Sequence, residues 1–303
     1  MYNKVKRQKS VKGSVVISGA SSGIGEACTI YLDKLGYQVF AGVRREADGE
    51  ALKCKALKRA IPIILDVTDE ASIKTSVGMV ELSLGSHGLT GLVNNAGIVS
   101  AGPLEFLPIS DLRKQLEVNV LGQIAVTQAF LPLLRKSSAG RIINIGSDSG
   151  KVSSPLLGAY CASKFALEAL TDALRMELQP WGINVSIIEP GAVTTPIWEK
   201  SIERVDEIWE SFPEQAKKLY SPTLEAVRKT AKKIGQNGIS AEEVAKVVSQ
   251  ALAVKRPKAR YVVGMDAKIN ILLAKIMPER VLDKLISLYL GLPKNAERQN
   301  SST

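Results

Sequence analysis

Short apolar runs alternate with longer amphipathic stretches along most of the chain. Seven runs rich in valine and isoleucine lie at Ser14 to Ser18, Gln38 to Val43, Pro62 to Val67, Gly91 to Asn94, Arg141 to Ile145, Asn184 to Glu189 and Ala259 to Gly264. Continuous apolar runs of this length are typical of parallel strands that helices cover on both faces. The pattern predicts an α/β fold, a single-domain Rossmann-type doubly wound parallel sheet of about seven strands.

Two of the intervening stretches are predicted as prominent helices. The first, 110–136, opens with a Ser/Asp cap signal and contains Pro132, which should kink or end the helix near its last turn. The second, 158–179, follows a polar loop at 147–155. Because no Pro/Gly/Ser-rich linker divides the chain, we expect one domain over 1–303 with its core at about 13–266.

The alternation breaks after the sixth run. The region 194–238 is charged, helical in parts and interrupted by Pro196, Pro213 and Pro222. An insertion at the carboxyl end of a strand lies beside the ligand crevice of such a sheet, so we interpret it as a mobile substrate flap. A solvated insertion without a ligand role is the alternative.

The end of the chain forms a second departure from the pattern. The segment 268–292 is apolar with scattered charges and predicts an amphipathic helical tail. Packing on the domain or on a second subunit is favoured, with contact to a membrane surface as the alternative.

Composition excludes several classes of function. The formal charge of +10 suits nucleic acid, an anionic membrane or a polyanionic cofactor, but only 5% of residues are aromatic and no basic-aromatic alternation supports nucleic-acid binding. The three cysteines, Cys28, Cys54 and Cys161, fit reduced thiols, and the single His87 argues against a metal site. The polar, basic N-terminus is neither a secretory signal nor a membrane span, which predicts a cytoplasmic protein.

The first strand leads directly into a glycine-rich turn. It reads Gly19-Ala20-Ser21-Ser22-Gly23-Ile24-Gly25 and is followed by a helical pattern. Glycines allow a tight turn and close approach to a pyrophosphate, which the helix N-terminus then stabilises. The turn therefore predicts a dinucleotide site, although its Gly-x3-Gly-x-Gly spacing differs from the commoner fingerprint.

The end of the second strand bears on which dinucleotide binds. Val43 stands where an NAD site would place a carboxylate, and Arg44 and Arg45 follow it. Guanidinium groups suit the 2'-phosphate, so NADP(H) is favoured over NAD(H). The arginines could instead be ordinary surface residues that pair with Glu46 or Asp48.

Several motifs together resemble the short-chain dehydrogenase/reductase family over about residues 13–195. These motifs are Ser18 to Gly25, Asn94-Asn95-Ala96-Gly97, Ser147, Tyr160-Cys161-Ala162-Ser163-Lys164, and Pro190-Gly191 with Thr195. The chain departs from the family pattern at Ser18, where threonine is usual. The flap and tail match only loosely and are more similar to the steroid and retinol dehydrogenase branch.

The spacing of the candidate catalytic residues agrees with this resemblance. Tyr160 and Lys164 are four apart on a predicted helix, so the ammonium can approach the phenol and, with an oxidised nicotinamide, favour phenolate. Ser147, at a strand end, can hold the substrate oxygen. The resemblance adds Asn119 as a link to Lys164 in a proton relay.

The remaining cofactor contacts are implied by the resemblance. Lys164 is expected to bond the nicotinamide ribose, and Asp66 and Val67 to flank the adenine. Asp66 could equally cap the next helix. The other expected contacts are Asn95 and Ala96 on the ribose side, and Val193 and Thr195 at the carboxamide.

These features predict hydride transfer between NADP(H) and a secondary alcohol or ketone. A lipophilic substrate is expected, with Trp198, Ile202, Trp209 and Phe212 as a candidate apolar lid. A dinucleotide-binding scaffold or redox sensor is the alternative, which the acid-base residues disfavour. The resemblance also implies a homodimer or homotetramer, formed through 110–136 and 158–179.

Overall fold

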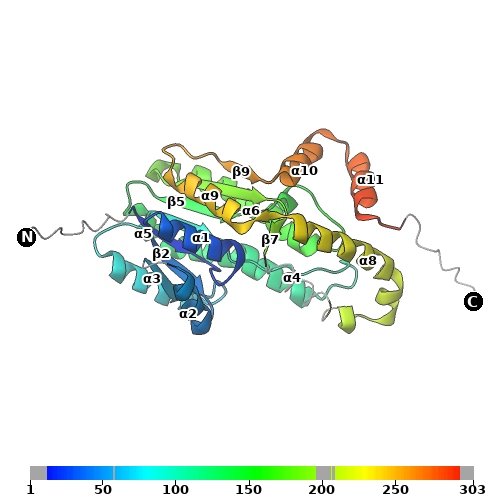
Figure 1. Ribbon diagram of the computed structural model, residues 1–303, viewed down its shortest axis with the longest axis horizontal. Coiled ribbons are helices and arrows are strands. Elements are labelled where there is room, and N and C mark those ends of the chain that lie inside the picture. The colour runs from blue at the N-terminus through cyan, green and yellow to red at the C-terminus, as the bar shows by residue number, and fades with distance from the viewer. Residues whose placement is uncertain (1–11, 57–58, 196–205, 207–208, 294–303) are drawn as a thin grey trace, which may run out of the picture.

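Seven parallel strands form the central sheet of the computed structural model, which describes residues 12–56, 59–195, 206 and 209–293 (Figure 1). The strand order is β3-β2-β1-β4-β5-β6-β9. The strands are β1 (Ser14–Ile17), β2 (Gln38–Val43), β3 (Ala60–Ile64), β4 (Gly91–Asn94), β5 (Arg141–Ile145), β6 (Asn184–Pro190) and β9 (Arg260–Val263). The predicted doubly wound sheet is confirmed.

The third strand differs from its predicted range of 62–67. It pairs only with β2, from Val39 opposite Ala60 to Val43 opposite Ile64. β2 ends at Val43, whose carbonyl accepts a last bond from the Leu65 N–H at 2.9 Å, and β3 ends at Ile64. Leu65, Asp66 and Val67 consequently form the loop that leaves the sheet.

Helices cover both faces of this sheet. The α-helices of the described residues are α1 (Gly23–Lys34), α2 (Glu46–Lys55), α3 (Glu70–Leu84), α4 (Ile109–Leu116), α5 (Gly122–Arg135), α6 (Gly158–Glu177), α8 (Glu214–Asn237), α9 (Ala241–Ala253), α10 (Met265–Ile276) and α11 (Glu279–Leu290). Figure 1 shows α1 and α9 side by side, in agreement with their many contacts.

Side-chain alternation along the strands divides the core into two layers. Val15 and Ile17 of β1 join the cluster that contains residues of α1 and α9. Val16 joins the opposite cluster, which includes residues of α3 and α5. Since successive strand residues point to opposite faces, each buried strand supplies both layers.

The predicted helix at 110–136 consists of α4, a π-helical turn at Glu117–Leu121, and α5. Pro132 lies in the last turn of α5, which ends at Arg135. The stretch Ile109–Arg135 is long and apolar enough to cross a membrane, but Val126 and Phe130 are fully buried in the core. It is therefore a core helix of the domain.

The flap is more regular than its prolines suggest. Pro213 precedes α8 as its N-cap, whereas Pro222 lies inside α8, which continues through it to Asn237. Two short strands, β7 (Val193–Thr194) and β8 (Ile239–Ser240), pair in parallel and join the two ends of the insertion. The part of the flap at 196–205 and 207–208 lies outside the described residues.

Beyond β9 the predicted helical tail is present as α10 and α11. Met277 and Pro278 separate the two helices, and Pro278 is the N-cap residue of α11. Figure 1 shows them in orange and red beyond β9, and α11 contacts α8.

The sheet order reverses direction between β1 and β4. The chain adds β2 and β3 on one side of β1, then returns to place β4 on the other side. Parallel strands on either side of such a reversal open a crevice at their carboxyl ends. Here Ser18 and Asn95 follow these ends, so the crevice lies at the predicted glycine loop and fourth-strand motif.

Candidate active site

The glycine loop is fastened to the end of β4. The Asn95 side-chain amide donates to the carbonyl oxygens of Ser18 (3.0 Å) and Gly19 (2.9 Å). In return, the Ser18 hydroxyl accepts bonds from the backbone N–H groups of Asn95 and Ala96, at 3.0 and 3.1 Å. Ser18 thus closes the junction in the place where the family usually has threonine.

The loop leaves no room for side chains at two of its glycines. Gly19 has a φ of 67°, and a Cβ there would lie 2.8 Å from the Cα of Ala96. A Cβ on Gly25 would overlap the Gly19 carbonyl and the Asn95 amide. The N-cap residue of α1, Ser22, makes no side-chain cap bond to the helix. An uncapped helix N-terminus behind a tight glycine turn fits a dinucleotide pyrophosphate.

The predicted 2'-phosphate residues lie at the start of α2. Arg45 is the N-cap of α2, and its guanidinium makes two bonds to Asp48, at 3.0 and 2.8 Å. Its side chain is nevertheless 77% exposed. Arg44 is exposed and makes no ion pair within the described part of the chain. Val43 before them is buried.

Asp66 stabilises the turn after β3. Its carboxylate accepts bonds from the Thr68 backbone N–H (2.9 Å) and hydroxyl (2.7 Å). The helix cap is instead supplied by Asp69, which accepts from Ala71. Val67 is buried and packs against Gly122, so the two predicted adenine-side residues lie on a rigid turn.

Ser147 begins a short 3-10 turn just beyond β5. Its hydroxyl accepts from the Ser149 backbone N–H at 3.1 Å and donates to Asp148 at the same distance. Burial raises the pKa of Asp148, partly offset by its bonds to Asn270 and Ser147. Ser147 is nine-tenths buried or more and is held in one orientation.

Tyr160 and Lys164 share a face of α6 beside this turn. The Lys164 ammonium donates to the Ile145 carbonyl at 2.8 Å and lies 5.6 Å from the centre of the Tyr160 ring. Burial lowers the pKa of Lys164 to about 8. Ser147 lies close enough to Tyr160 to lower the pKa of the phenol, so the three predicted residues are brought together.

The surroundings that the protein itself supplies to Tyr160 act against phenolate, whereas the predicted lowering of its pKa includes the charge of an oxidised nicotinamide. Burial of the phenol raises its pKa above the usual range, and the hydrogen bond with Ser147 only partly offsets this. Asp148 adds a further raising influence. The low-dielectric surroundings penalise phenolate more than the neighbouring Lys164 favours it. Tyr160 is therefore held in its protonated form.

Asn119 lies in the π-helical turn between α4 and α5. Its carboxamide accepts from the Ile98 N–H (2.9 Å) and donates to the Ile98 carbonyl (3.0 Å) and to Ser163 (3.1 Å). Ser163 in turn donates to the Tyr160 carbonyl at 2.7 Å. π turns often occur at functional sites. This one connects the loop after β4 to the helix that carries Tyr160.

The end of β6 completes the ring of predicted residues. The Gly191 N–H donates to the Val263 carbonyl, and the Ala192 N–H donates to Asp266 at 2.8 Å. Val193 is buried in β7, and a Cβ on Gly23 would lie 3.3 Å from Thr195. Pro190 ends β6. The motif after β6, which contains Thr195, therefore contacts the glycine loop at Gly23 across the crevice.

Comparison with known proteins agrees with this geometry. The model of the short chain dehydrogenase family matches residues 13–206. The chain belongs to this family.

Relatives of this short-chain dehydrogenase extend over most of its length. It is 37% identical over 286 residues to retinol dehydrogenase 5 of Mus musculus, covering 92% of the chain and 89% of the relative. It is 36% identical over 284 residues to the NADPH-dependent 3-dehydrocapnine reductase of Ornithobacterium rhinotracheale, covering 92% and 97%. A solved short-chain dehydrogenase from Streptomyces avermitilis superimposes with a TM-score of 0.72, 27% identity and coverage of 94% and 99%.

A carboxylate pair behind Lys164 was not predicted. Glu168, one helical turn after Lys164, accepts from Lys151 (2.7 Å) and Arg260 (3.0 Å). Glu189 of β6 faces the same two cations at 3.7 and 3.6 Å. Burial raises the pKa of Glu189 to about 7, reinforced by the neighbouring Glu168. The spacing Tyr160, Lys164, Glu168 on one helix face was the available signal.

Leu156, just before α6, was also missed. It is the one described non-glycine residue with a positive φ, at 65°. Its carbonyl accepts from the Gly102 N–H at 2.8 Å, and its side chain is buried. Strained backbone of this kind is concentrated at functional sites. It fixes the turn that leads to Tyr160, and no property of leucine in the sequence signals it.

The flap aromatics pack close to this site. Phe212 is buried with Leu107 and Ala159, the residue before Tyr160, and its ring lies 5.7 Å from that of Trp209. The predicted lid residues Trp209 and Phe212 therefore lie together. Trp198 and Ile202 fall outside the described residues.

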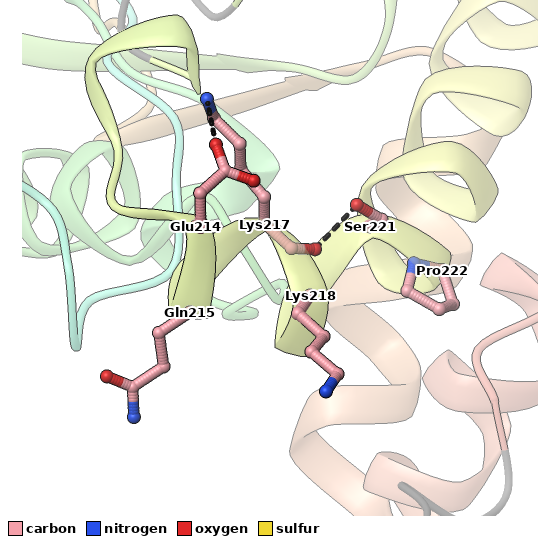
Figure 2. Close-up of a pocket in the computed structure, with 6 residues that line it drawn as sticks. All are labelled: Glu214, Gln215, Lys217, Lys218, Ser221 and Pro222. Carbon is pink, nitrogen blue, oxygen red and sulfur yellow. Dashed lines mark hydrogen bonds and ion pairs between the residues drawn. The ribbon is translucent and has the colours of Figure 1, made fainter.

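A surface hollow on α8 is separate from the catalytic residues. Figure 2 shows its lining, in which Lys217 pairs with Glu214 and the Ser221 hydroxyl donates to the Lys217 carbonyl. The remaining lining residues are Gln215, Lys218 and Pro222. All six belong to two turns of one helix. The hollow is therefore a feature of the flap exterior and does not enclose Tyr160.

Gly25→Ala should weaken binding of the reduced nicotinamide dinucleotide by about tenfold or more, because its methyl group would displace the loop that receives the pyrophosphate. Gly78→Ala is the matched control, a helical glycine with open space around it. Nicotinamide fluorescence titration measures both. Unchanged affinity in folded Gly25→Ala protein would refute the assignment of this loop.

Glu189→Gln should alter the pH dependence of stability. The raised pKa of about 7 means that the folded state favours the protonated carboxyl, so its stabilising contribution is full below 4.5 and is lost as pH rises through 7. The free energy of unfolding should fall by about 1–3 kcal/mol over this window in the wild type relative to Glu189→Gln. Denaturant titrations at several pH values measure this free energy. Glu225→Gln, at an exposed position on α8, is the control. The same change of unfolding free energy with pH in the wild type and in Glu189→Gln would contradict the raised pKa of Glu189.

Proposed function

We propose that this protein transfers a hydride reversibly between NADP(H) and a lipophilic secondary alcohol or ketone. Its membership of the family and its relatives establish an oxidoreductase of alcohols and carbonyls. The observation that carries the mechanism is the convergence of Ser147, Tyr160 and Lys164 at the end of β5. The cofactor and the substrate class are the proposed part.

The residues act on the oxygen of the substrate. The Ser147 hydroxyl, which donates to Asp148, can turn to donate to the substrate oxygen and stabilise the negative charge that develops there. Tyr160 then gives its proton to that oxygen; burial, which raises the pKa of the phenol, keeps this proton in place until the transfer. The nicotinamide, when bound, supplies or accepts the hydride.

Lys164 and Asn119 support this proton transfer. The ammonium of Lys164 is buried beside the phenol ring and stabilises negative charge left on Tyr160 after it donates. Asn119 holds the start of α6 through its bond to Ser163, and the bonds of its carboxamide group to Ser163 and Ile98 fix the orientation of this group. We therefore assign Asn119 as a positioning residue.

NADP(H) is favoured by the end of β2. Arg44 and Arg45 are exposed beside the glycine loop, and buried Val43 offers no carboxylate to a ribose hydroxyl. The Arg45 pair with Asp48 is open to solvent, where such pairs contribute little, so a 2'-phosphate can compete for the guanidinium. The NADPH-dependent relative supports the same preference.

A lipophilic substrate is favoured by the apolar cluster beside Tyr160. Leu107, Phe212 and Ala216 pack around Ala159, and Trp209 borders them. Pockets for apolar ligands are lined largely by such side chains. The similarity to retinol dehydrogenase 5 supports this class of substrate.

We also propose that the chain forms a homodimer or homotetramer through the helices predicted for this purpose. Leu121 in the π turn and Phe165 on α6 are 56% and 44% exposed. Large apolar side chains on two neighbouring helices are typical of a subunit contact.

Tyr160→Phe should lower kcat for ketone reduction by about 10²- to 10⁴-fold, because it removes the proton donor and keeps the ring. NADPH affinity should change little. NADPH absorbance on a panel of lipophilic and short ketones measures turnover, and Tyr31→Phe is the control. Wild-type turnover in Tyr160→Phe would refute the mechanism, whereas NADPH binding by the wild type without turnover on any carbonyl would favour a scaffold.

Replacing both Arg44 and Arg45 by alanine should raise the KM for NADPH by about 10- to 100-fold, because bonds to the charged phosphate are lost. The KM for NADH should change little. Steady-state kinetics with both cofactors measure this, and Arg256→Ala, at the opposite end of the sheet before β9, is the control. Equal changes for both cofactors would contradict the assignment.

A further inference from the structure

Helix α10 leaves an apolar stripe uncovered on the protein surface. Its inner side buries Ala267 and Ile271 against the domain. Four large apolar side chains lie on the opposite side at spacings of four, three and four residues and are between 51% and 67% exposed: Met265, Ile269, Leu272 and Ile276. This spacing follows the helical repeat, so the stripe is continuous along one face.

Helix α11 repeats this arrangement. Its Leu290 is buried, and four other large apolar residues are between 39% and 74% exposed: Val281, Leu285, Leu288 and Tyr289. We call these eight side chains the tail face. Monomeric proteins rarely leave so many large apolar residues exposed on consecutive helices without a partner or a membrane to cover them.

Charged residues are sorted around the tail face. On α10, Lys268 and Lys275 are exposed and lie four and three residues from Leu272, which places them along its border. The acidic residue of α10, Asp266, instead accepts a hydrogen bond from the Ala192 N–H through its carboxylate.

The second helix shows the same sorting. Lys284 is exposed and lies between Val281 and Leu288, and Arg280 lies one turn before it. Glu279 and Asp283 fall on the side of the buried Leu290. On both helices, cations border the apolar side chains; the acids of α11 lie on its buried side, and Asp266 of α10 accepts from the Ala192 N–H.

We propose that the tail face docks on the surface of an anionic phospholipid bilayer. The apolar side chains would enter the boundary between head groups and acyl chains, and the bordering lysines and arginine would lie among the anionic head groups. Tyr289 is suited to the same boundary because its ring is apolar and its hydroxyl is polar.

The charge of the chain favours this partner. With its formal net charge of +10, the chain is attracted to an anionic bilayer. The exposed apolar residues considered for self-association, Leu121 and Phe165, lie on other helices. Subunit contact and lipid contact therefore use different surfaces.

The docked helices are connected to the active site. Asn270 of α10 donates to Asp148 at 2.9 Å, and Asp148 accepts from the Ser147 hydroxyl. Helix α11 contacts the flap helix α8. Delivery of a lipophilic substrate from the bilayer to this site would rest on the proposed function, but docking itself does not.

Vesicle sedimentation of the full-length protein tests docking. Vesicles of phosphatidylcholine with phosphatidylserine should bind the wild type, and binding should weaken with added salt and without phosphatidylserine. Leu272→Glu with Leu288→Glu should weaken binding by about tenfold or more, because both changes place a carboxylate at the boundary. The matched control is Met79→Glu with Leu82→Glu, two exposed apolar residues on α3.

Three results would overturn the proposal. The first is that the wild type does not bind the vesicles. The second is that the tail variant, Leu272→Glu with Leu288→Glu, binds them as well as the wild type does. The third is that the tail variant forms a smaller oligomer in sedimentation, which would assign the tail face to a subunit contact. Turnover of a water-soluble ketone should be unchanged in the tail variant. Loss of vesicle binding with normal turnover would show that docking and catalysis are independent. Docking can therefore be tested whether or not the proposed function is correct.

Discussion

The junction between the glycine loop and the end of β4 is the constraint on which the site depends. Parallel pairing of β1 with β4 places Gly19 against Ala96 with no space for a Cβ, and the Asn95 amide bonds the loop carbonyls. Strand β4 also pairs with β5, so the end of β5 and the following Ser147 are fixed relative to the glycine loop. A sheet that reverses at this point brings phosphate binding and proton chemistry to one edge.

Burial then determines the protonation states on α6. The helix carries Tyr160, Lys164 and Glu168 on one face, from the crevice toward the carboxylate pair with Glu189. Burial keeps the phenol protonated and lowers the pKa of the lysine to about 8. Tyr160 therefore carries the proton that ketone reduction needs, whereas removal of a proton from an alcohol requires positive charge near the phenol to favour phenolate.

Much of this could be predicted from the sequence because buried parallel strands and glycine turns leave strong local patterns. The seven strands, α6 and the grouping of Ser147, Tyr160 and Lys164 followed from such patterns. The pairing of β7 with β8 was not predictable, since two-residue strands carry no periodicity. Glu189, Leu156 and the raised Tyr160 pKa depend on contacts between distant segments, which no local pattern reports.

The most direct test of the account is the fate of isotope from the cofactor. Reduction of a lipophilic ketone with NADPH that carries deuterium at both C4 positions should give an alcohol with one deuterium on the former carbonyl carbon, detected by mass spectrometry. The new hydroxyl proton should come from solvent through Tyr160. An alcohol product without deuterium on carbon, or no alcohol at all from protein that binds the cofactor, would contradict hydride transfer at this site.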